Sequence, residues 1–132
     1  MERLYIDEII GKNMSKLRDD EKWTQARLAD LLERYTATAW NQQQVSLAEN
    51  GKRRFKVVDL FVLGVIFKVS PLRLIRTGRD EVLIQFGNIG VLETRLLEDW
   101  ITGPRGYVSA EELTTEWPEP MNYDEPLRRF LR

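Results

Sequence analysis

Apolar residues recur at spacings of three and four along the first part of the chain, with charged residues between them. This period places the apolar side chains on one face of a helix, and it predicts amphipathic helices over residues 4–18 and 25–35. Thr24 stands immediately before the second helix, where its side-chain oxygen can accept a hydrogen bond from the first turn. The polar residues 19–22 separate the two helices. The pattern therefore indicates two short helices joined by a tight break.

A third helix is predicted over residues 42–49, after a connection of small and β-branched residues that ends at Trp40. Asn41 is a suitable N-cap for this helix. Gly51 follows the helix closely, and glycine readily adopts the left-handed conformation in which helices end. Local signals therefore bound this helix at both ends.

Residues 57–68 are almost entirely apolar. This segment is long for a strand, so we interpret it as a buried fourth helix. Ser70 and Pro71 mark the start of a fifth helix, which Gly78 ends. Together the five predicted helices indicate an all-α domain over residues 1–78 that is large enough to fold by itself.

The rest of the chain, residues 79–132, is predicted to be a small helical extension with a tail. Residues 82–86 are compatible with a strand or a short helix, and we interpret them as a helix. A further helix is predicted over residues 91–102. A capping-box pattern starts a short helix over residues 109–116. The prolines that follow Trp117 argue against regular structure in the tail.

One apolar stripe on the predicted helix over residues 91–102 has two interpretations. It consists of Leu92, Leu96 and Trp100, which are spaced four residues apart. The stripe can belong to the core of the extension, or it can be the interface through which two copies of the chain form a dimer.

Composition narrows the possible chemistry. The chain has 132 residues and contains neither Cys nor His. This excludes disulfides, thiolate and imidazole metal sites, cysteine nucleophiles and any triad that needs a histidine base. The acidic pairs Glu98-Asp99 and Glu111-Glu112 lie on polar helix faces, and no partner group is suggested for them. We therefore expect no enzyme activity, no metal and no cofactor.

Charge is distributed unevenly along the chain. Residues 1–80 contain 15 Lys and Arg against 11 Asp and Glu, a net charge of +4, whereas residues 81–132 contain 5 against 10, a net charge of −5. The first part is therefore suited to a polyanion, and the acidic part is not. The longest apolar run, residues 60–67, is too short for a membrane span, and the N-terminus lacks a signal-peptide pattern. We expect a cytoplasmic protein with no membrane partner.

The most informative stretch runs from Thr24 to Lys56. The predicted helix over residues 42–49 begins with three glutamines, and a basic cluster over residues 52–56 follows it. A helix that reads the major groove of DNA needs side chains that both donate and accept hydrogen bonds, and a glutamine amide can pair with two atoms of adenine. Flanking cations hold phosphates. The stretch therefore predicts a DNA-reading element.

Residues 10–75 resemble the Cro/C1-type (XRE family) helix-turn-helix domain of bacterial and phage repressors. The resemblance is carried by short motifs along this segment: Ile10-Gly11, Leu17-Arg18, Thr24-Gln25, Leu28-Ala29, Val45-Ser46, Glu49-Asn50-Gly51-Lys52-Arg53, Val69-Ser70 and Leu74. It implies a five-helix, lambda-repressor-like fold that reads DNA with its third helix. The connection before that helix is longer than in the commonest form of the family, whose turn takes about three or four residues.

The resemblance also implies roles for individual residues. Gln25 corresponds to a position that contacts the DNA backbone and braces the reading helix, and Gln42 and Gln43 correspond to base-reading positions. Arg18 and Glu49 correspond to an internal ion pair that ties the first helix to the third. The outward neighbours that could reach bases or phosphates are Gln44, Ser46 and Leu47. The implied phosphate contacts are Asn50, Lys52, Arg53 and Arg54.

Two functions are compatible with these features. The first is a sequence-specific transcriptional regulator, a repressor, that binds double-stranded DNA as a homodimer. Its acidic C-terminal region would supply the dimer contact or receive a signal. The second is a protein-interaction module, such as an antitoxin or an anti-regulator, whose C-terminal part binds a partner protein.

Overall fold

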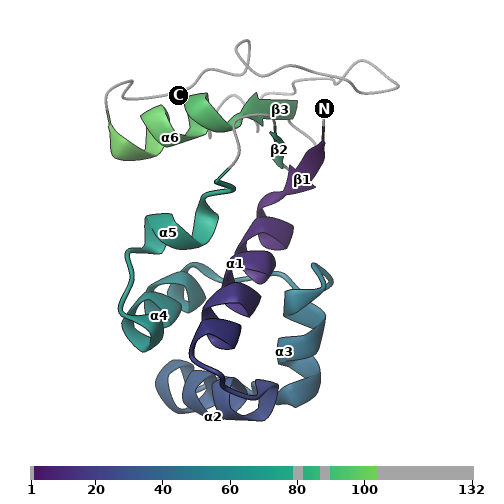
Figure 1. Ribbon diagram of the computed structural model, residues 1–132, viewed down its shortest axis with the longest axis vertical. Helices are drawn as coiled ribbons and strands as arrows, with labels where there is room; N and C mark the ends of the chain where they lie inside the picture. Colours follow the sequence, from purple (N-terminus) through teal and green to yellow (C-terminus); the bar gives the residue numbers. More distant parts are fainter. Residues whose placement is uncertain (1, 79–81, 87–89, 104–132) are drawn as a thin grey trace, which may run out of the picture. The chain divides into compact units, whose positions relative to one another are not determined.

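The computed structural model describes residues 2–78, 82–86 and 90–103 of the chain (Figure 1). The elements within these residues are β1 (Arg3–Tyr5), α1 (Ile6–Asp20), α2 (Gln25–Thr36), α3 (Gln42–Glu49), α4 (Val57–Phe67), α5 (Pro71–Ile75), β2 (Leu83–Phe86), β3 (Gly90–Glu93) and α6 (Thr94–Thr102). The protein is thus mostly helical but includes a small sheet, so the prediction of an all-α fold is wrong in this respect. The helix predicted over residues 109–116 and the tail after it lie outside the described residues.

The chain forms two compact units. Residues 6–76, which we call the head, contain α1 to α5. The second unit, the extension, contains β1, β2, β3 and α6. The predicted division at residue 78 did not anticipate that the N-terminal strand belongs with the residues after the head.

In the head, α1 runs between α3 on one side and α4 and α5 on the other (Figure 1). Helix α1 packs against α3 and α5, and α2 packs against α3 and α4. All five helices and the connection before α3 contribute fully buried side chains to one core: Ile10, Met14, Leu28, Leu32, Trp40, Val45, Leu63 and Leu74.

Local capping explains where the helices of the head begin. The Thr24 hydroxyl accepts a hydrogen bond from the Arg27 N–H at 3.0 Å, which confirms the predicted start of α2. Ser70 caps α5 in the same way, accepting from the Leu72 N–H at 3.1 Å. Helix α1 begins two residues later than predicted, since Arg3–Tyr5 form a strand.

The close approach of α1 to α3 depends on a glycine. A Cβ atom at Gly11 would collide with the backbone carbonyl oxygen of Ala48. Because no side chain intervenes, the two helices pack backbone to backbone at this point. This contact places α3 at the surface of the head with one face covered and the opposite face open.

Helix α4 differs from the prediction of a buried helix. Leu63 is fully buried, whereas Val57, Phe61 and Val65 are 71%, 59% and 69% exposed. These three residues are spaced four apart and form one face, which we call the α4 stripe. Helix α4 packs against α2 and α5, and in a unit of this size the α4 stripe meets solvent although it is apolar.

The extension contains a three-stranded sheet in the order β1-β2-β3. Strand β1 pairs with β2 in parallel, with Leu4 opposite Ile84, and β2 pairs with β3 in antiparallel register, with Ile84 opposite Leu92. These three side chains are buried and lie on one face of the sheet. The prediction of a helix over residues 82–86 is therefore wrong, because a short apolar run has no helical period and here finds strand partners on both sides.

Helix α6 starts at Thr94 rather than at residue 91, since residues 91–93 belong to β3. The Thr94 hydroxyl donates a hydrogen bond of 2.8 Å to the Val82 carbonyl, which fixes this start against the strand region. The helix ends at Thr102, as predicted, and Gly103 follows it in the left-handed conformation with φ 100°. None of the helices in the described ranges is long and apolar enough to cross a membrane.

The orientation of α4 can be tested with one substitution on its buried face and one on its exposed side. Leu63→Ala removes a buried side chain and should lower the free energy of unfolding by about 3 kcal/mol. Val58→Ala, at a position that is 49% exposed, should change the free energy of unfolding by less than about 0.5 kcal/mol. Urea unfolding followed by circular dichroism measures both values, and equal losses would contradict the observed orientation.

Candidate nucleic-acid interface

Helix α3 has well-defined ends. The Asn41 side-chain oxygen accepts a hydrogen bond from the Gln44 N–H at 2.8 Å, so the helix starts at Gln42 as predicted. At the other end the Gly51 N–H donates to the Ala48 carbonyl and the Lys52 N–H donates to the Leu47 carbonyl, at 3.1 and 2.8 Å. This pair of bonds is a Schellman motif, and Gly51 provides the left-handed residue that it requires, with φ 73°.

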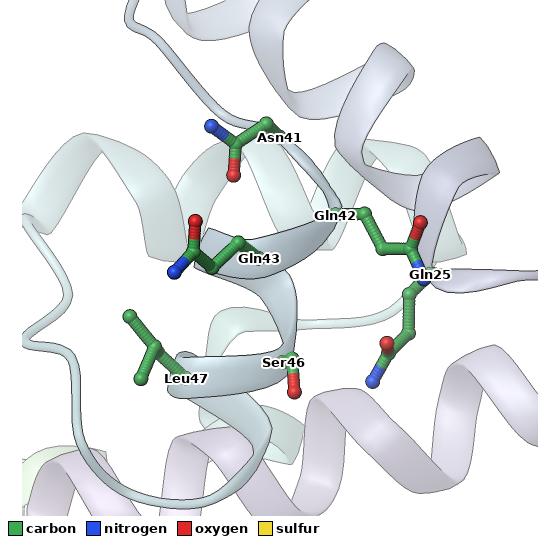
Figure 2. Close-up of a pocket in the computed structure, with 6 residues that line it drawn as sticks. All are labelled: Gln25, Asn41, Gln42, Gln43, Ser46 and Leu47. Atoms are coloured by element: carbon green, nitrogen blue, oxygen red, sulfur yellow. The ribbon is translucent and has the colours of Figure 1, made fainter.

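The first turn of α3 presents amide side chains to solvent. Gln42 and Gln43 are exposed, whereas Val45 and Ala48 face the core. Around this turn is an open hollow of ≈ 500 Å³, lined by Gln25, Asn41, Gln42, Gln43, Ser46 and Leu47. In Figure 2 the Gln43 and Leu47 side chains leave α3 on one side, and the Gln42 side chain extends toward Gln25 on the other. Two helices therefore contribute polar groups to one concave surface.

Gln25 is held beside α3 by a network that joins three helices. Its amide nitrogen donates to Glu49 Oε1 at 2.9 Å. Arg18 donates to both oxygens of the same carboxylate, at 2.6 Å from Nε and 3.0 Å from Nη2. The predicted pairing of Arg18 with Glu49 is thereby confirmed as an internal contact, and Gln25 joins it.

The Arg18–Glu49 pair is shielded from solvent, since the two side chains are 14% and 7% exposed. Arg18 also donates to the Trp23 carbonyl at 2.7 Å. The hydrogen bond to Glu49, opposed by partial burial and aided by the charges of Glu49 and Asp19, raises the pKa of Arg18 above its ordinary value. The guanidinium of Arg18 therefore stays protonated at physiological pH.

The Arg53 side chain is largely shielded from solvent, although the resemblance implies a phosphate contact for it. Its Nε donates to the Gln44 side-chain oxygen at 2.8 Å, and its guanidinium carbon lies 3.6 Å from the ring centroid of Trp40. The other implied phosphate contacts are exposed: Asn50, Lys52 and Arg54. The Asn50 amide nitrogen donates to the Ser46 carbonyl at 2.8 Å, so this side chain completes the end of α3.

The prediction that Leu92, Leu96 and Trp100 form an apolar stripe on one helix is wrong, because they do not all lie on the same helix. Leu92 lies in β3 and is 2% exposed, whereas Leu96 and Trp100 are half-buried on α6. Because the helix starts at Thr94, Leu92 is one of the sheet's core residues. Leu92 is therefore excluded from any dimer contact.

Two residues near α3 carry contacts that the sequence analysis missed. Asp59 is 1% exposed and accepts a hydrogen bond from the Lys56 N–H at 2.8 Å, so it caps α4. Trp40, at the end of the connection before α3, forms the base on which the Arg53 guanidinium lies. The position of Asp59 three residues after Lys56 was an available signal for a cap. Within the described residues, no group of three or more acidic side chains could hold a metal ion.

Comparisons with known proteins return no match: no protein-family model, no curated protein sequence and no solved structure is significantly similar to the chain.

The contribution of the Arg18–Glu49 pair to stability can be measured by removing Glu49. Glu49→Ala removes the shielded charge partner of Arg18 and should lower the free energy of unfolding by about 3 kcal/mol. Asp19→Ala is the matched control, because Asp19 lies 3.5 Å from the same guanidinium but is 71% exposed. That change should cost less than about 0.5 kcal/mol. A denaturation experiment in which the two variants lose the same stability would refute the internal role of Glu49.

Proposed function

We propose that the head is the DNA-binding domain of a transcriptional regulator and that α3 enters the major groove. The observation that carries this proposal is the first turn of α3, where exposed Gln42 and Gln43 border a hollow that Gln25 of α2 also lines. The major groove is about 12 Å wide and admits one helix. Amide groups on an exposed helical turn can reach base edges there, because each donates and accepts hydrogen bonds.

The surroundings of α3 support the same proposal. Lys52 and Arg54 are exposed immediately after the helix, where cations can contact phosphates on either side of the groove. The shielded Arg18–Glu49–Gln25 network keeps α2 and α3 in one arrangement, so the polar groups are positioned before DNA arrives. On this basis we assign the head to the lambda-repressor-like helix-turn-helix class of the XRE family, acting as a repressor in the cytoplasm.

One short helix makes few base contacts, so we propose that the protein binds as a homodimer. Two heads related by a twofold axis would read half-sites about 34 Å apart. The α4 stripe is the proposed contact, because Val57, Phe61 and Val65 are exposed and carry no charge. Such a surface can face its own copy without bringing like charges together.

Selection of bound sequences from a pool of random duplex DNA tests the reading role of α3. The unmodified protein should enrich a defined motif. Gln42→Ala and Gln43→Ala should each lower affinity for that motif about tenfold while leaving binding to unrelated duplexes unchanged.

Lys52→Ala and Arg54→Ala should instead weaken binding to all duplexes, and each should reduce the slope of log K against log salt by about 0.9. Arg73→Ala is the control, since Arg73 is an exposed cation on α5. No enriched motif, or full affinity in both glutamine variants, would overturn the proposal.

Light scattering on the purified protein tests the dimer. The mass should be twice the 15.6 kDa of one chain, and Phe61→Glu on the α4 stripe should reduce it to that of one chain. Ile101→Glu on α6 is the matched control, because Ile101 is also an exposed apolar residue and should leave the mass unchanged. A monomer in the unmodified protein, or a dimer lost only in Ile101→Glu, would contradict a contact at α4.

A further inference from the structure

The connection between α2 and α3 contains Trp40, whose ring contacts the guanidinium of Arg53. Trp40 stands two residues before α3 and is 1% exposed. The guanidinium carbon of Arg53 lies 3.6 Å from the centroid of the Trp40 ring, a cation–π contact that burial strengthens. Phe55 packs against the same indole, with the ring centroids 6.3 Å apart. Trp40 therefore forms a rigid base beneath Arg53.

Polar contacts hold the edges of the Arg53 guanidinium, in addition to the contact of its face with Trp40. Nε donates to the Gln44 side-chain oxygen at 2.8 Å, and Nη1 donates to the Arg54 carbonyl at 3.1 Å. Nη1 also lies 3.9 Å from Oδ2 of the buried Asp59, an attractive charge contact. The Arg53 side chain is only 21% exposed. Several contacts thus fix one orientation of a side chain that is usually mobile.

The bond from Arg53 determines which atoms Gln44 can offer to a ligand. Because the Nε–H of arginine only donates, the amide atom that faces it must be the oxygen. The amide nitrogen, with its two N–H groups, is then directed away from Arg53. An unrestrained glutamine offers a donor and an acceptor together, which suits adenine. Gln44 in this state offers donors, which suit a hydrogen-bond acceptor on a guanine edge or a phosphate.

We propose that Arg53, supported by Trp40, is a positioning residue that makes Gln44 a dedicated hydrogen-bond donor toward an acceptor on DNA. The inference rests on the proposed DNA-binding function and adds a specificity to it. Guanine is the base we assign to Gln44, since guanine presents two acceptors, N7 and O6, in the major groove. The role of Arg53 is to orient Gln44 rather than to bind a phosphate.

The first experiment needs no DNA and tests the orientation alone. Nitrogen-15 relaxation of the side-chain amides in the full-length protein should show the Gln44 amide as rigid and that of the exposed Gln43 as mobile. Arg53→Lys keeps the positive charge but loses the planar group and its Nε–H, so the Gln44 amide should become as mobile as that of Gln43. A mobile Gln44 amide in the unmodified protein would overturn the inference.

The second experiment measures base preference with the selected duplex and its single-base-pair variants. Gln44→Ala should reduce the preference for guanine at one position about tenfold, and Arg53→Lys should reproduce that loss at the same position. The salt dependence of Arg53→Lys should stay that of the unmodified protein. Arg73→Lys, the same exchange at an exposed arginine of α5, should leave the preference unchanged. Trp40→Phe retains an aromatic ring beneath Arg53 and should reduce the guanine preference less than Arg53→Lys does. It replaces Arg53→Lys as the test variant if that variant does not fold.

The outcomes separate this inference from the proposed function. If Gln44→Ala weakens binding to all sequences equally, and Arg53→Lys does the same with an unchanged salt slope, the acceptor is a phosphate and the donor role stands. If Gln44→Ala alters base preference and Arg53→Lys does not, the positioning role is refuted while DNA reading stands. If the unmodified protein selects no sequence, the proposed function fails and the role of Arg53 in DNA recognition fails with it.

Discussion

A single carboxylate, that of Glu49, holds the arrangement on which the rest of the head depends. This carboxylate accepts hydrogen bonds from Arg18 on α1 and from Gln25 on α2, and Glu49 is the last residue of α3. Three helices are therefore joined at one shielded point. Because a shielded charge pair is stable only in a well-defined geometry, this contact favours one relative placement of α2 and α3 over nearby alternatives. The hollow beside Gln42 depends on this placement, because it is lined by Gln25 of α2 as well as by residues of α3.

The long connection before α3 is held in place by a buried side chain, that of Trp40. Ala37 ends α2 in the left-handed conformation with φ 55°, and Trp40 then turns into the core. Among the described residues, the indole N–H of Trp40 has no acceptor, a cost that the buried ring area and the contact with Arg53 offset. The connection thus stabilises the start of α3 and at the same time supplies the base for a side chain that orients Gln44.

Helix α4 shows how a small domain divides its apolar residues between a core and a surface. Its inner face contributes Leu63, and the buried Asp59 caps its first turn. Its outer face, the α4 stripe, has no cover within the head. Exposed apolar surface of this kind is uncommon in isolated domains and marks contacts with other proteins. In the proposed dimer the stripe would gain the burial that the head itself is too small to provide.

The sequence by itself determined where α2, α3 and α5 start, because the capping residues Thr24, Asn41 and Ser70 act within one turn of the chain. The sequence also showed that α3 begins with three glutamine side chains, Gln42 to Gln44. Only the tertiary structure decided that β2 is a strand, since its partner β1 comes from the opposite end of the described chain. It likewise decided which face of α4 is buried and that Arg53 points at Trp40 and Gln44. Such contacts join residues that belong to different elements, and the local sequence pattern does not reveal them.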